Sequence, residues 1–147
     1  MNEFSDPILP IQPSTPDQRM EKLNIKVLVA DDDEDVLEIS TRMLKRMDYT
    51  VETVKNGKEL IERLANAKPG EFSLVITDNT MPIMTGIEAL KQIRADERFK
   101  DLPIILNSGD HGIEEIVKNI GGLYLKKPYG LKDFRAIVEE ALAKSKS

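Results

Sequence analysis

Short apolar runs alternate with stretches of helical periodicity from residue 25 onward. Such runs are typical of strands buried on both faces, and we expect strands at 25–30, 50–54, 72–77, 103–106 and 123–125. Between them, apolar residues recur three and four positions apart, which predicts amphipathic helices. The clearest spacing is that of Ile113, Ile116, Val117 and Ile120, in a short helix. The pattern therefore predicts five strand–helix units.

Strands that alternate with helices through short connections imply a parallel sheet with helices on both faces. Five such units most often give the doubly wound order 2-1-3-4-5, the flavodoxin-like (βα)5 arrangement. In that order the chain reverses direction between the first and third strands. The crevice outside their carboxyl ends is the expected ligand site of this α/β fold.

The first 24 residues differ from the remainder. Pro7, Pro10, Pro13 and Pro16 recur every third residue, which places them along one edge of a polyproline II helix. We expect residues 1–24 to form an extended tail and residues 25–147 to form the folded domain. The tail is either a plain leader, which is the simpler interpretation, or a docking segment for a proline-recognising partner.

The composition is that of an ordinary globular protein, with 40% hydrophobic and 32% charged residues among 147. A net charge of -5, with no basic cluster longer than Lys126-Lys127, argues against a nucleic-acid or anionic-membrane surface. The absence of cysteine fits a reducing cytoplasm. No apolar run approaches membrane-spanning length, and no secretory signal pattern opens the chain. We expect a soluble cytoplasmic protein that binds neither nucleic acid nor membrane.

Carboxylates follow the two strands that the predicted order places side by side. The first strand ends in Asp31-Asp32-Asp33, and the third ends in Asp78. Two carboxylates about 4 Å apart repel by roughly 4 kcal/mol at an effective dielectric of about 20, so their pKa values rise unless a cation neutralises them. Hard oxygen ligands of this kind suit Mg²⁺. Asp33 and the two acidic residues after it are explained by capping of the next helix, whereas Asp31, Asp32 and Asp78 predict a magnesium site.

Two further polar groups follow the fourth and fifth strands. Ser108 offers a small hydroxyl beside Gly109, and Lys127 precedes Pro128, which holds it extended and aims it outward. Alone, Lys127 would be a solvated lysine at a strand end. Carboxylates, a metal, a hydroxyl and an ammonium at one edge are what an anionic phosphoryl group requires.

The residues at these strand ends resemble the receiver domain of two-component response regulators. The matching segments are 27–32, 78–86, 103–109 and 124–128, and the match covers about residues 25–145 in order and spacing. The resemblance implies a phosphorylation-dependent switch in a two-component system or phosphorelay. It implies no enzyme activity beyond self-catalysed phosphotransfer and autodephosphorylation.

The resemblance also implies roles for individual residues. Asp78 would accept a phosphoryl group from a phosphohistidine of a sensor histidine kinase or a histidine phosphotransfer protein. Asp31 and Asp32 would hold Mg²⁺ together with Asp78 and the backbone carbonyl of Thr80. Lys127 would contact the phosphate, and its bond to the following proline is typically cis in the family.

Four residues have implied roles in switching and in decay of the phosphorylated state. Ser108 would be the hydroxyl that moves toward the phosphoryl group, and Tyr124 the aromatic that turns inward as it moves. Thr80 and Asp110 would match two variable positions that tune dephosphorylation. The resemblance implies that these two residues set the rate of dephosphorylation by controlling how the attacking water reaches the phosphoryl group.

The chain departs from the family pattern in several places. Asn107 replaces a usually apolar residue, and a buried amide there would need partners. Thr85 stands where the family often has Asp, at a loop position that we do not expect to be chemical. His111, the sole histidine, is expected at the surface. The segment from 108 to 127 is short, so the fourth helix is short and the family's usual output surface is not expected unchanged.

Two other functions compete with the phosphorylated switch. One is a receiver-like binding module without phosphotransfer. The other is a phosphohydrolase of the haloacid-dehalogenase kind, but its nucleophile strand usually carries Asp-x-Asp, and Thr80 stands at the second position here. Only residues 143–147 follow the last predicted helix. We therefore expect a stand-alone receiver that signals by contact with a downstream protein.

Overall fold

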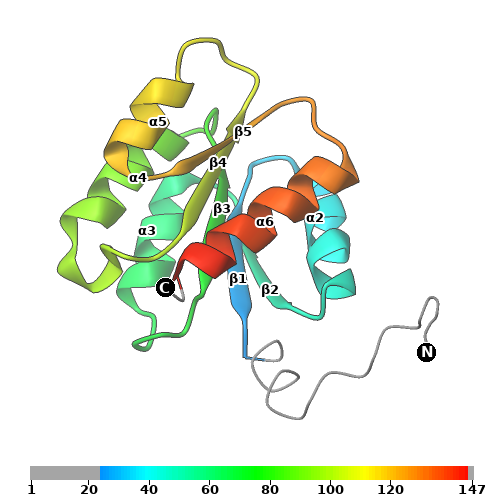
Figure 1. The fold of residues 1–147 in the computed structure, drawn as a ribbon. Helices are drawn as coiled ribbons and strands as arrows, with labels where there is room; N and C mark the ends of the chain where they lie inside the picture. The colour runs from blue at the N-terminus through cyan, green and yellow to red at the C-terminus, as the bar shows by residue number, and fades with distance from the viewer. Residues whose placement is uncertain (1–23, 146–147) are drawn as a thin grey trace.

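Five parallel strands form the centre of the protein in a computed structural model, which describes residues 24–145 (Figure 1). They are β1 (Lys26–Ala30), β2 (Thr50–Val54), β3 (Leu74–Asp78), β4 (Ile104–Ser108) and β5 (Leu123–Lys126). Parallel pairing joins them in the order β2-β1-β3-β4-β5. The predicted doubly wound α/β fold is therefore confirmed. The tail that we predict over residues 1–24 lies, apart from Asn24, outside the described residues.

Helices cover both faces of the sheet (Figure 1). The α-helices are α2 (Glu34–Arg46), α3 (Gly57–Ala65), α4 (Gly86–Ala95), α5 (Glu114–Ile120) and α6 (Leu131–Ser145), with a 3-10 helix η1 (Glu97–Phe99) after α4. The helices α2 and α6 pack on one face, and α3, α4 and α5 pack on the other. Of the helices described here, none is both apolar enough and long enough to span a membrane.

Side chains point alternately to the two faces of the sheet, which divides the core into two clusters. On β1, Val27 and Val29 pack toward α2 and α6, whereas Leu28 and Ala30 pack toward the other three helices. Strands β3 and β4 are buried at every position. Successive side chains of a strand point to opposite faces, so burial on both faces requires apolar residues at consecutive positions. This is the physical origin of the apolar runs in the sequence.

The two central strands extend further toward their carboxyl ends than predicted. Strand β3 includes Asp78 instead of ending at Thr77, and β4 runs on through Asn107 to Ser108 instead of ending at Leu106. Backbone groups make the ladder, so a polar side chain does not end it. Asp78 pairs in register with Asn107. Polar residues of the candidate site therefore sit on the rigid sheet itself.

Helix α5 is short, as predicted, but only some of the four apolar residues predicted on its inner face are buried. The helix has seven residues and ends at Gly121, whose φ of 104° is left-handed. Val117 is fully buried, whereas Ile116 is 44% exposed. Ile113 and Ile120 are partly buried. Two turns present only a narrow face to the sheet and α4, which leaves Ile116 outside that face.

Side-chain caps define where two helices that border the site begin. Asp33 caps α2, because its carboxylate accepts hydrogen bonds from the amides of Asp35 and Val36. Thr85 caps α4 in a capping box: its hydroxyl accepts from the amide of Glu88, whose carboxylate accepts from the amide of Thr85. Thr85 thus has a structural role in starting α4.

Candidate functional site

Three carboxylates converge at the carboxyl ends of β1 and β3. Asp31 follows β1 directly, Asp32 comes next, and Asp78 is the last residue of β3. One oxygen from each of the three lies within 4.8 Å of the others. Asp31 and Asp78 are only 3% and 6% exposed, whereas Asp32 is open to solvent. The strand order therefore assembles the acidic cluster that the sequence predicts.

Burial and the neighbouring charge of Asp78 make Asp31 costly to ionise. Burial raises the pKa of Asp31 to about 6; the backbone amide of Asp33 opposes the shift, the charge of Asp78 adds to it, and the ammonium of Lys127 opposes it. A bound cation would remove this cost. The donor set, with carboxylate oxygens from three residues, suits Mg²⁺. The residues present therefore fit the predicted metal.

Lys127 reaches the cluster from the other side of β4. Its Nζ donates a hydrogen bond to Oδ1 of Asp78 over 2.7 Å. Burial by itself lowers the pKa of Lys127, but the hydrogen bond and the charges of Asp78 and Asp31 outweigh it, and the pKa is raised. The Lys127–Pro128 peptide bond is cis, as the resemblance implied. The lysine is therefore a charged partner of the central carboxylate.

A tight loop after β3 fixes the position of Asp78. A Cβ on Gly86 would lie 2.3 Å from the carbonyl oxygen of Asp78, so only glycine fits there. The backbone carbonyl of Asn79 accepts from the amide of Gly86, and its side-chain oxygen accepts from the amide of Ile87. These contacts fasten the start of α4 to the end of β3. The side chain of Thr80 is exposed on this loop.

A second hydrogen-bonded group forms at the end of β4. Ser108 is buried, and its Oγ accepts from the amide of Asp110 over 2.9 Å. The phenol of Tyr124 lies 3.0 Å from the carbonyl oxygen of Ser108 and 3.2 Å from that of Asp110, and donates to both. The three residues therefore form one unit at the start of the β4–α5 loop.

The sheet places these two groups side by side. Asp78 and Asn107 are register partners, and the amide of Asn79 donates to the carbonyl of Asn107 over 3.2 Å. The predicted residues thus lie at one edge of the sheet, although no hydrogen bond joins the side chains of Ser108 and Asp78 in the part of the chain that the structure describes. The roles assigned to these residues remain predictions. His111 is exposed, as expected.

The sequence alone did not single out Tyr129, which lies near the site, and it left the partner of Asn107 open. Burial raises the pKa of the Tyr129 phenol, the charge of Lys127 lowers it, and the charges of Asp31 and Asp78 raise it further. Its place directly after the Lys-Pro pair was the available signal. Asn107 is 4% exposed, and among the described residues its Oδ1 is buried without a hydrogen-bond partner.

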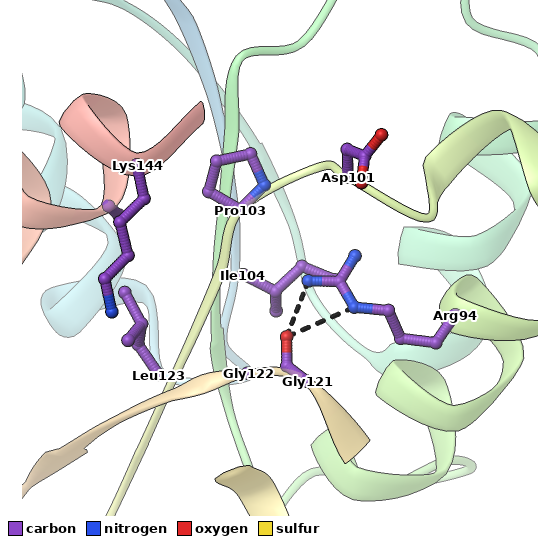
Figure 2. A pocket seen from close by; sticks show the side chains of 9 residues that line it. Arg94, Asp101, Pro103, Ile104, Gly121, Gly122, Leu123 and Lys144 are labelled. Atoms are coloured by element: carbon purple, nitrogen blue, oxygen red, sulfur yellow. Dashed lines mark hydrogen bonds between the residues drawn. The ribbon is translucent and has the colours of Figure 1, made fainter. Parts of the chain in front are cut away.

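A pocket of about 490 Å³ lies at the opposite end of the sheet, where β4 and β5 begin (Figure 2). Its wall includes Arg94, whose Nε and Nη2 donate to the carbonyl of Gly121. The Nη1 of Arg94 donates to the carbonyl of Phe99. The guanidinium therefore fastens α4 to the end of η1 and to the loop before β5. We assign this pocket a structural role, separate from the acidic site.

Most of the chain is similar in sequence to proteins of one known family. A family model described as the response regulator receiver domain matches residues 27–139. The chemotaxis protein CheY-3 of Vibrio cholerae is 32% identical over 110 residues, which cover 72% of this chain and 82% of that protein. The two-component response regulator ARR11 of Arabidopsis thaliana is 34% identical over 125 residues, which cover 83% of this chain. The chain spans only 23% of the length of ARR11.

The fold is also similar to solved structures. The response regulator protein TrrA of Thermotoga maritima, solved in complex with Mg²⁺ and BeF, has a TM-score of 0.71 and is 25% identical. The similarity covers 80% of this chain and 99% of that one.

Proposed function

The chain belongs to the response regulator receiver domain family, and on that premise we propose that it is a phosphorylation-dependent switch whose phosphoacceptor is Asp78. One observation carries this assignment of the acceptor. Asp78 ends a fully buried strand between two other carboxylates and a lysine ammonium 2.7 Å away. A buried nucleophile held between a cation and a candidate metal site is positioned for phosphoryl transfer.

The proposed donor is a phosphohistidine on a sensor histidine kinase or a histidine phosphotransfer protein. A carboxylate oxygen of Asp78 forms a bond to phosphorus as the P–N bond of the phosphohistidine breaks. The electron pair of that bond leaves with the imidazole nitrogen, which then takes a proton from solvent. The product is an aspartyl phosphate. The negative charge at the site therefore increases, and the protein must stabilise it.

The carboxylates of Asp31, Asp32 and Asp78 would hold Mg²⁺, with the backbone carbonyl of Thr80 as a further proposed ligand. Mg²⁺, when bound, neutralises carboxylate charge and stabilises the transferring phosphoryl group. TrrA, whose structure holds Mg²⁺ and BeF, supports this choice of metal. The oxygen donors within 4.8 Å of one another in this chain support it independently.

Other residues of the chain respond to the new charge. Lys127 would transfer a hydrogen bond from Asp78 to the phosphoryl group, and Ser108 would donate its hydroxyl proton to it. Ser108 now accepts from the amide of Asp110, and Tyr124 donates to both carbonyls of that unit. A shift of Ser108 would therefore disturb the β4–α5 loop and Tyr124. We propose that Thr80 and Asp110 tune the loss of the phosphoryl group through access of water.

Phosphorylation of this kind would bias two conformations that already exist, by a coupling of about 1–3 kcal/mol. The chain would turn over no substrate other than its own phosphoryl group. We propose that its signal passes to a downstream protein by direct contact. A cytoplasmic site of action is part of the proposal, supported by the cysteine-free composition.

Intact mass spectrometry tests the proposed function. The wild-type chain is incubated with acetyl phosphate and Mg²⁺ and should gain the mass of one phosphoryl group, but not when EDTA is present. Asp78→Asn keeps the shape of the side chain and removes the nucleophile, so it should gain none. A wild-type chain that binds Mg²⁺ but gains no phosphoryl group would instead favour the binding-module alternative.

A further inference from the structure

Asn107 lies on β4, the strand that the contact between Lys127 and Asp78 crosses. Strand β4 separates β3, which ends in Asp78, from β5, which Lys127 follows (Figure 1). Asn107 is the register partner of Asp78 on one side and of Leu125 on the other. Register partners in a parallel sheet point to the same face. The ladder continues to Lys127, whose amide donates to the carbonyl of Ser108. Lys127 therefore shares the face of Leu125 and Asn107, and its ammonium reaches Asp78 across β4 on that face.

The amide of Asn107 has an unused acceptor at this place. The residue is 4% exposed, and its Oδ1 is a buried oxygen without a hydrogen-bond partner among residues 24–145. Buried polar groups are nearly always hydrogen-bonded, because an unpaired one keeps its desolvation penalty. The rest of β4 is apolar up to this point, so packing alone does not explain an amide here. An amide retained at this cost indicates a partner in another state.

The ammonium of Lys127 is a donor on the same face of the sheet, bound to the register partner of Asn107. An ammonium has three N–H donors, and within the described residues Lys127 donates one hydrogen bond, to Oδ1 of Asp78. Two donors therefore remain. A second fixed acceptor would hold the ammonium in one direction when its first hydrogen bond passes from Asp78 to a phosphoryl group.

We propose that Asn107 is a positioning residue for Lys127, whose Oδ1 accepts a hydrogen bond from the ammonium as phosphoryl transfer takes place. This inference rests on the proposed function. Asn107 itself touches neither the phosphodonor nor the reacting atoms. It acts by holding the lysine in the direction that the transferred group requires.

The variant Asn107→Leu separates positioning from packing. Leucine has the same branched four-atom skeleton as asparagine, although its two methyl groups make it larger. It removes the unpaired buried oxygen, which offsets the cost of the added volume, so resistance to urea should stay near that of wild type. The rate of phosphorylation by acetyl phosphate at saturating Mg²⁺ should nevertheless fall about ten-fold, because the lysine loses a fixed acceptor. An equal rate in wild type and variant would overturn the inference. If Asn107→Leu does not fold, Asn107→Val, with a strand-favouring side chain, is measured in the same way.

Two controls locate the effect. Ile105→Val removes one methylene from the same strand and the same face as Asn107, and its rate should stay within about two-fold of wild type. In a Lys127→Gln background, Asn107→Leu should change the rate by less than about two-fold, because its partner is already gone. An equal loss in both backgrounds would show that Asn107 does not act through Lys127. A wild-type chain that is never phosphorylated would overturn the proposed function itself, whereas a phosphorylated wild type with an unaffected Asn107→Leu overturns this inference alone.

Discussion

The ammonium of Lys127 lies 2.7 Å from Oδ1 of Asp78, although a whole strand of the sheet separates the two residues. This contact joins the ends of β3 and β5 across β4. It also brings a positive charge against the carboxylates of Asp78 and Asp31. The free energy of metal binding and the rate of phosphoryl transfer should therefore both depend on it.

Removing the Lys127 charge should have opposite effects on these two quantities. In Lys127→Met, three carboxylates lose their cation, so Mg²⁺ should bind about ten-fold more tightly. The rate of phosphorylation should fall about 100-fold, because a charged donor to the transferring group is lost. Titration calorimetry and acetyl phosphate kinetics measure the two effects. The matched control is Lys126→Met at the exposed neighbouring lysine; equal behaviour of both variants would refute the assigned role.

Gly86 should tolerate no larger residue. In Gly86→Ala the new methyl would lie 2.3 Å from the carbonyl oxygen of Asp78, so the end of β3 or the start of α4 must move. We expect the free energy of unfolding to fall by about 1–3 kcal/mol, as in other overpacked sites. Urea unfolding measures the change. Gly130→Ala is the matched control, since its methyl would meet nothing within 4 Å, and a similar loss there would contradict the steric explanation.

Thr85 should matter for stability and not for chemistry. Thr85→Ala removes the capping box of α4 and should cost about 0.5–2 kcal/mol in the free energy of unfolding. The rate of phosphorylation should stay within about two-fold of wild type. Thr85→Asp restores a good cap and should recover most of the stability. A large loss of rate in Thr85→Ala, with the fold intact, would place this residue in the site after all.

An ion-pair network away from the site should govern stability in acid. Hydrogen bonds from Lys26, the amide of Lys68 and Arg63 lower the pKa of Glu71 from 4.5 to about 2. Because the pKa is lower in the folded state, the ionised Glu71 contributes stability above pH 4.5, and this contribution is lost as the pH falls from 4.5 toward 2.

The variant Glu71→Gln tests this dependence. Its free energy of unfolding should be lower than that of wild type at neutral pH. The difference should shrink as the pH falls through the range from 4.5 to about 2. Urea unfolding at several pH values measures the two curves, and parallel curves would contradict the shifted pKa.

The fold and the acidic site could be predicted because both follow from strand ends. Apolar runs locate the strands, and in a parallel sheet their carboxyl ends meet at one edge. Asp31 and Asp78 therefore had to be close once the strand order was known. The cation at Lys127 followed from the same argument, although its reach across β4 depends on a side-chain path that only the structure shows.

What the sequence could not predict depends on side-chain partners. Whether the amide of Asn107 would find a donor, and which face Ile116 would occupy on a two-turn helix, are decided by neighbours far away in the chain. Thr85 differs from the family pattern, but a threonine caps a helix as aspartate does, so the change is neutral for the fold. The approach of the Tyr129 phenol to the site charges likewise required the tertiary structure.

Asp78 is the expected site of phosphorylation, and reduction with borohydride identifies the phosphorylated residue. Borohydride converts an aspartyl phosphate to homoserine, which peptide mass spectrometry then locates after treatment of the chain with acetyl phosphate and Mg²⁺. Homoserine is expected at position 78 alone, and none in a sample kept in EDTA. Homoserine at another aspartate, or a phosphorylated chain with aspartate retained at position 78, would contradict the assignment of Asp78.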